Sequence, residues 1–151
     1  MNVLIDVLPI CAFRLQDAEN SMELTIIEVE RRSYRQGYFV TVLLDTYFGG
    51  LAVQTDHRFT HDNLCGFYSQ LRDCCDKVNG EVRFPAEDWG TLMFTMSFTE
   101  AGHVIVNGEF HDYDIVRGST KRTFELQTEH TAIRPMLADL NQVYRLLVNL
   151  K

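Results

Sequence analysis

The sequence of 151 residues has little cysteine, proline or basic charge, and it lacks long apolar runs. No apolar stretch approaches the roughly 20 residues that span a bilayer, so no membrane segment is expected. Asp and Glu number 21 against 14 Lys and Arg, a formal net charge of -7. This balance argues against the broad electrostatic attraction that non-specific binding to nucleic acid or to an anionic membrane requires. With 46% hydrophobic residues and only three prolines, the composition is that of an ordinary globular domain.

The four cysteines match neither a disulfide framework nor a zinc motif. Cys74 and Cys75 are adjacent and no CxxC is present, so reduced, buried thiols are the expected state. The apolar N-terminus has no basic residue before Arg14 and is interrupted by Asp6 and Pro9. It therefore lacks the charged region of a signal peptide, and a cytoplasmic location is expected.

The first sixty residues are typical of antiparallel strands joined by tight turns. Segments rich in β-branched and aromatic residues cover residues 10–15, 22–30, 38–44 and 51–57, and each is expected to form a strand. Gly49 and Gly50 separate the last two segments and can supply the positive φ of a hairpin.

Between Thr60 and Gly80 the apolar period changes from two residues to that of a helix. Thr60 or Asp62 can cap the start of this helix, and Gly80 is a plausible stop. The side chains expected on its buried stripe are Leu64, Phe67, Tyr68, Leu71, Cys74, Cys75 and Val78.

The two-residue period returns after this helix. Residues 80–84, 91–99, 103–111 and 121–128 are expected to be strands, and the turn at Gly102 makes the second and third the clearest hairpin of the chain. A second helix is expected at the end, with an apolar stripe from Ile133 to Val148.

The order strands, helix, strands, helix predicts an α+β fold. We expect a mainly antiparallel sheet of about seven or eight strands that buries one face beneath the two helices or curls into a partly open barrel around them. No linker, repeat or low-complexity segment divides the chain, so residues 1–151 are expected to form a single domain.

Motifs for catalysis, metal or cofactor binding are weak. His57 and His61 are flanked by acids, but they lie at a strand end and a helix start and lack the HExxH arrangement, which favours solvated loop residues over a metal site. Cys65 is near a helix start without a His–Asn signature, which favours a packed thiol over a nucleophile. GxSxG, P-loop and Rossmann motifs are absent. We therefore predict no catalytic residue, no cofactor and no metal.

A polar cluster near residue 110 is the best candidate for partner binding. Glu109 and His111 are expected on the outward face of one strand, and a hydrophilic strand end, a partner patch and a cation site all remain open there. Glu81 and Glu125 are also expected to face outward, and Trp89 lies in a polar loop as either a core cover or a partner anchor. The candidate partner-binding residues are Glu109, His111, Asp112, Asp114, Glu125 and Trp89.

The ordered features resemble the WapI-like group of small bacterial proteins, typified by the immunity protein of the WapA tRNase toxin. The resemblance extends over residues 22–150. It rests on the helix pattern Leu64, Phe67 and Leu71, the strand from Gly80 to Phe84, the hairpin glycines Gly102 and Gly108, and the junction from Gln127 to Thr131 into the last helix.

Two features depart from the group. The junction from Gln127 to Thr131 keeps a Thr but not the acidic–amide pair, and the loop from Pro85 to Gly90 has no clear counterpart. The resemblance implies a cytoplasmic protein that binds and neutralises a cognate toxin without catalysis of its own, and it transfers no catalytic residue.

Three hypotheses follow. The first is a non-catalytic protein that binds a basic toxin through its acidic surface. The second is a small-ligand-binding domain or enzyme with a pocket between sheet and helices, favoured if buried carboxylates and histidines cluster in one pocket. A flat acidic face with exposed aromatic side chains would favour the first instead. The third is a homo-oligomer that covers its strand edges.

Overall fold

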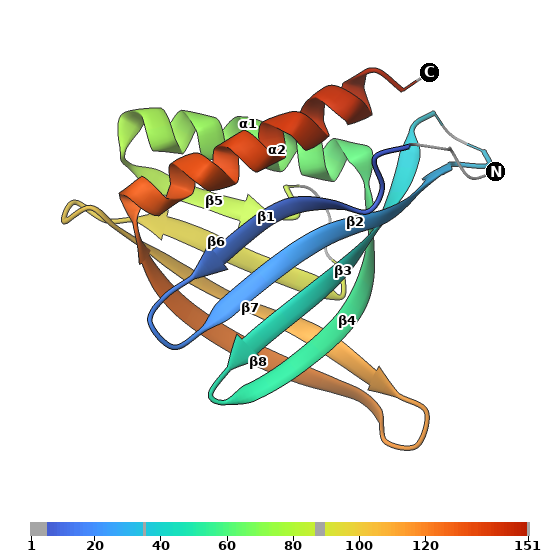
Figure 1. Cartoon of the computed structure of the whole chain (residues 1–151), viewed down its shortest axis with the longest axis horizontal. Helices are drawn as coiled ribbons and strands as arrows, with labels where there is room; N and C mark the ends of the chain where they lie inside the picture. The colour runs from blue at the N-terminus through green and yellow to red at the C-terminus, as the bar shows by residue number, and fades with distance from the viewer. Residues whose placement is uncertain (1–5, 35, 87–89, 151) are drawn as a thin grey trace.

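The structure of the chain is a computed structural model that describes residues 6–34, 36–86 and 90–150 (Figure 1). Within these ranges it contains eight strands, two α-helices and a short 3-10 helix. The elements in chain order are β1 (Ile10–Gln16), β2 (Ser21–Arg31), β3 (Tyr38–Phe48), β4 (Leu51–Thr60), α1 (His61–Lys77), β5 (Gly80–Phe84), β6 (Leu92–Phe98), β7 (His103–Asp114), β8 (Gly118–Glu129), the 3-10 helix His130–Ala132 and α2 (Ile133–Val148).

The strands form two antiparallel sheets of four, which we call sheet A (β1-β2-β3-β4) and sheet B (β5-β6-β7-β8). The predicted α+β class, with antiparallel strands and two helices, is confirmed. The alternative of a curled, partly open barrel does not occur, because neither sheet closes or curls. In the chain α1 separates β4 from β5, and the hydrogen-bonded ladders stop on either side of it.

Local sequence signals fix the turns and the start of α1. Gly49 and Gly50 have φ of 58° and 80°, and they join β3 to β4 as the sequence predicts. The Oγ1 of Thr60 accepts a hydrogen bond from the backbone N–H of Asn63 at 3.3 Å, so Thr60 is the N-cap. The helix ends at Lys77, followed by Val78 in the left-handed conformation with φ of 51°.

The core lies between the inner faces of the two sheets and beneath the helices. Alternation along β6 buries Leu92, Phe94, Met96 and Phe98, as predicted. Helix α1 packs on β5 and α2 packs on β1 and on α1, so the helices lie together along one end of the two sheets (Figure 1). In the described part of the chain, neither helix is both long and apolar enough to span a membrane.

Aromatic rings fill the core near the helices. The ring centroids of Phe84 and Phe94 are 5.0 Å apart in a stacked arrangement, and Phe67 of α1 meets both edge-on at 5.0 and 5.6 Å. Phe13 of sheet A meets Phe94 of sheet B at 5.9 Å. These contacts join both sheets and α1 through buried rings.

Candidate interaction surfaces

Three of the sequence-predicted partner residues lie on the outer face of sheet B. Glu109 and His111 share the solvent side of β7, and Glu125 is exposed on β8. The Glu109 carboxylate lies 4.0 Å from the Lys121 ammonium, and His111 Nδ1 lies 3.2 Å from the Ser119 hydroxyl. The structure therefore brings Glu109 and His111 to one face and gives each a partner within it.

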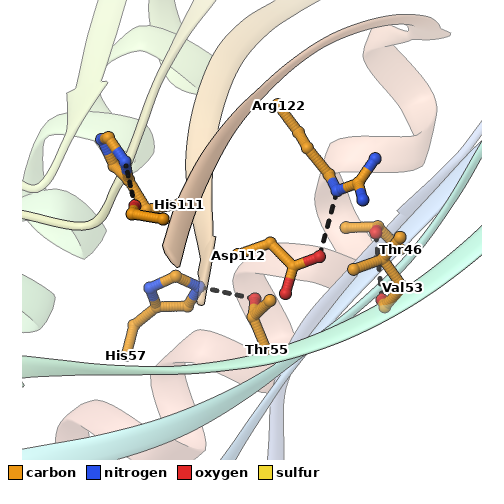
Figure 2. A network of polar contacts seen from close by, with 8 residues as sticks. Thr46, Val53, Thr55, His57, His111, Asp112 and Arg122 are labelled. Atoms are coloured by element: carbon orange, nitrogen blue, oxygen red, sulfur yellow. Dashed lines mark hydrogen bonds and ion pairs between the residues drawn. The ribbon is translucent and has the colours of Figure 1, made fainter. Parts of the chain in front are cut away.

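The other predicted residues do not join this group. Asp112 is on the same side of β7 as buried Phe110, and it accepts a hydrogen bond from Arg122 Nε at 3.2 Å (Figure 2). Asp114 Oδ1 accepts from the backbone N–H of Val116 at 2.8 Å, which closes the β7–β8 turn. Trp89 lies outside the described residues.

The tip of the β7–β8 hairpin exposes apolar side chains. Tyr113 is 73% exposed, Ile115 90% and Val116 91%. These side chains project from the end of sheet B without contributing to the core. They form a second candidate contact region. The sequence analysis named polar residues next to this tip but not these apolar side chains.

The outer face of sheet A was not singled out by the sequence. Phe39, Leu43 and Tyr47 recur every four residues on the solvent side of β3, and we call them the β3 row. The inner side of the same strand carries the buried Val40, Val42 and Leu44. The sequence did contain a signal for this face, because β3 has large apolar side chains on both sides. In a strand with one side exposed to water, apolar and polar residues normally alternate.

Carboxylates surround the β3 row. Two of them have arginine partners: Glu23 with Arg14 at 2.8 Å and Glu30 with Arg58 at 3.7 Å. The remaining three have no ion-pair partner among the described residues. The carboxylates of this face are Glu23, Glu28, Glu30, Asp45 and Asp56.

A hollow of about 420 Å³ lies on the same face. Its walls include the Arg14–Glu23 pair, Asp45 and Tyr47. Gln54 Nε2 donates a hydrogen bond to Asp45 Oδ1 at 2.7 Å and holds that carboxylate in place. The hollow is large enough for one long side chain and is lined by both an aromatic ring and acidic oxygens.

His57 is buried, so its interpretation as a solvated loop residue was wrong. Strand β4 continues to Thr60, and its alternation turns His57 inward, where it is 3% exposed. Its Nε2 lies 2.7 Å from the Thr55 hydroxyl (Figure 2), and its Nδ1 contacts the hydroxyl of Thr91, next to sheet B. Burial lowers the pKa of His57 to about 4, so the ring is neutral at pH 7.

The remaining chemistry candidates are structural. His61 opens α1, and its Nδ1 accepts the backbone N–H of Tyr38 at 3.2 Å. Burial, reinforced by Asp62, raises the pKa of the Cys65 thiol to about 11, which leaves it protonated and unreactive at neutral pH. Over the described ranges, no three His, Cys, Asp or Glu side chains gather closely enough to hold a metal ion.

A second hollow, of about 470 Å³, lies between β1 and α2, where the ligand hypothesis expects a pocket. Arg14, Met136 and Asp139 are among its lining residues. Asp139 is the only carboxylate there, and the lining contains no histidine within the described residues. The clustered carboxylates and histidines that would favour a catalytic pocket are therefore not assembled at this place.

The candidate sites on this two-sheet α+β fold are therefore the outer faces of the two sheets and the tip of the β7–β8 hairpin. The chain belongs to the immunity protein WapI-like family, because the model of that family matches residues 14–147. The match extends from β1 into α2 and confirms the resemblance stated from the sequence. No curated protein and no solved structure matches the chain.

Proposed function

We propose that the protein is a cytoplasmic immunity protein that binds a cognate bacterial toxin and neutralises it without catalysis of its own. Membership of the WapI-like family over residues 14–147 is the observation that carries this proposal. The match begins within β1 and ends within α2, so it includes nearly every element that builds the two sheets and the helices.

The charge of the chain supports a basic toxin as the partner. At a formal net charge of -7, the protein attracts positive surfaces over distances of about a Debye length, roughly 8 Å at physiological salt. Such attraction speeds encounter and selects against acidic partners. Toxins that act on nucleic acid carry positive surfaces, which makes a nuclease a suitable target.

The assignment of partner contacts to Glu109, His111, Asp112, Asp114 and Glu125 stays a prediction from the sequence, which the variant E109K/E125K described below tests. Of these, Glu109, His111 and Glu125 are placed where one partner surface can reach them together. Asp112 and Asp114 serve the hairpin itself through Arg122 and the turn backbone.

A genetic experiment tests the proposal. Disruption of this gene beside an intact adjacent toxin gene is expected to stop growth, and restoring this gene on a plasmid is expected to rescue it. A strain in which the toxin's catalytic residue is also inactivated serves as the control and should grow without the immunity gene. Normal growth of the disrupted strain while the toxin is active would contradict the proposal.

The hollow between β1 and α2 keeps a small ligand as the second candidate function. A thermal-shift panel of metabolites and metal ions tests it. A saturable rise in melting temperature that Met136→Trp abolishes would support ligand binding, since the larger ring fills the hollow. Silence over a broad panel would count against it.

A further inference from the structure

We propose that the toxin docks on the outer face of sheet A, with the β3 row at the centre of the contact and basic side chains of the toxin against Glu28, Asp45 and Asp56. This inference rests on the proposed function and adds to it the surface and the chemistry of the partner.

The apolar part of this face is not needed by the fold. The inner side of β3 already supplies Val40, Val42 and Leu44 to the core, while the β3 row points to the opposite side of sheet A. Tyr47 is 46% exposed. An apolar centre with a polar rim is the usual anatomy of a protein interface.

The charges of the face identify the kind of occupant. Glu28, Asp45 and Asp56 have no ion-pair partner among the described residues, so each can form an ion pair with an incoming cation. With five carboxylates against Arg14, Arg58 and Arg32, whose guanidinium carbon lies 5.1 Å from the centroid of the Phe39 ring, the described face is acidic. Two copies of it would repel each other, which favours a basic partner over a second copy of this chain.

The hollow beside Tyr47 fits one arginine or lysine of that partner. The Asp45 carboxylate keeps Oδ2 for an incoming donor, since its bond from Gln54 is to Oδ1. The Tyr47 ring offers a π face to the same cation. The face already shows this chemistry at Phe39, where the guanidinium carbons of Arg58 and Arg32 lie 3.8 and 5.1 Å from the ring centroid.

The outer face of sheet B offers a cation a weaker combination of groups. Its Glu109 is near Lys121, and its Glu129 lies 3.0 Å from His103 Nδ1. Glu81 and Glu125 have no ion-pair partner among the described residues, but no described strand of sheet B carries an outer apolar row like the β3 row beside them. The exposed hairpin tip carries no unpaired acid, because Asp112 is paired with Arg122 and Asp114 closes the turn.

Charge-reversal variants on different faces test the inference. D45K/D56K changes sheet A, E109K/E125K changes the competing patch on sheet B, and D73K/D76K on the exposed side of α1 is the matched control. Each pair moves the net charge by four units, from -7 to -3. Affinity is measured by calorimetry against the catalytically inactivated toxin encoded beside this gene, at physiological salt.

We expect the sheet A variant to raise the dissociation constant about 100-fold, and the sheet B and α1 variants about threefold or less. The uncharged variant Y47S should raise it about tenfold or more, which separates local contact from long-range attraction. Circular dichroism and melting curves confirm that each variant is folded.

The outcomes separate the inference from the proposed function. If wild-type protein neither binds the toxin nor rescues growth, the proposed function fails. If wild type binds and E109K/E125K is the damaging variant, or all three pairs weaken binding equally, the proposed function stands and docking on sheet A is wrong. Full rescue of growth by a variant that combines D45K, D56K and Y47S would also show that docking on sheet A is wrong.

Discussion

The two sheets are alike on the inside and different on the outside. Both inner faces carry large apolar side chains, such as Leu44 in sheet A and Phe94 in sheet B. The outer face of sheet A carries an apolar row beside three carboxylates that have no ion-pair partner among the described residues, whereas the described outer face of sheet B has no such row and carries two, Glu81 and Glu125. Packing of the core accounts for the apolar side chains on both inner faces. It does not account for the difference between the outer faces, which fits the proposal that sheet A binds a partner.

The interior also differs from one end to the other. Near the helices the sheets meet through rings such as Phe13 and Phe94. Farther from them, Phe48 of β3 meets Phe124 of β8 with ring centroids 5.1 Å apart, and the buried His57 of β4 contacts the hydroxyl of Thr91 beside sheet B. The contact of His57 is therefore the part of this region that responds to pH.

The sharpest test of the inside–outside difference uses neighbouring leucines of β3. Leu44 is fully buried and Leu43 is half-buried on the outer face. Leu44→Ala should lower the free energy of unfolding by about 3 kcal/mol, because it removes apolar contacts and leaves a cavity. Leu43→Ala should cost about 1 kcal/mol or less. Urea unfolding measures both, and equal losses would mean that the outer face is part of the core.

Gly108 tests the inner face of sheet B. A Cβ at this position would lie 2.5 Å from the Met93 carbonyl oxygen and 2.5 Å from Phe94 Cβ. Gly108→Ala is expected to cost about 3 kcal/mol, since backbone atoms must move to admit it. Asn107→Ala, exposed on the same strand, is the control and should change stability by about 0.5 kcal/mol or less. A well-tolerated alanine at position 108 would show that sheet B is packed less tightly there.

The next smaller expected effect is the change in the free energy of unfolding with pH that is due to His57. Its pKa is about 4 in the fold against 6.5 in the unfolded chain, mainly through burial, with Asp56 opposing and His111 adding to the shift. The unfolded chain therefore binds more protons, and stability is lost as the pH falls from 6.5 toward 4. Between pH 7 and pH 5 the loss due to His57 should be about 2 kcal/mol.

A variant isolates this contribution from the other histidines. His57→Gln keeps hydrogen-bonding groups near Thr55 and Thr91 but does not titrate. Its own stability should be lower at pH 7, and its decline between pH 7 and pH 5 should be smaller than that of wild type by about 2 kcal/mol. Parallel pH profiles of the two proteins would refute the role given to His57.

The smallest expected effects concern exposed ion pairs. The Glu109–Lys121 pair on sheet B and the Arg14–Glu23 pair on sheet A lie at the surface. Double-mutant cycles should give each a coupling of about 0.5 kcal/mol or less, which decreases with added salt. A coupling well above about 1 kcal/mol for either pair would mean that surface charges stabilise the fold more than the two-sheet comparison assumes.

The sequence predicted most of the local structure because the signals were local. The alternation of Leu92, Phe94 and Met96 identifies β6 without knowledge of its neighbours, and Thr60 caps α1 through a bond three residues away. The division into two sheets was not predicted. Every ladder joins consecutive strands, and the local pattern does not tell whether β4 and β5, on either side of α1 in the chain, also pair with each other.

The interaction surfaces were predicted less well for the same reason. Glu109 and His111 were placed on one face by the two-residue period, and this was correct. His57 was misplaced because β4 continues three residues beyond its apolar pattern, so the ring lies within the strand and faces inward instead of lying in a solvated loop. The face of sheet A combines residues of four strands, so only the fold reveals it.

Hydroxyl-radical footprinting of the toxin complex tests docking on sheet A most directly, because each sheet offers a tyrosine as a probe. Tyr47 on sheet A is 46% exposed and Tyr113 on the sheet B hairpin is 73% exposed. The account predicts that toxin binding decreases oxidation of Tyr47 by about fivefold or more, as expected for burial in an interface core, and leaves Tyr113 unchanged. Protection of Tyr113 with Tyr47 still open would contradict it.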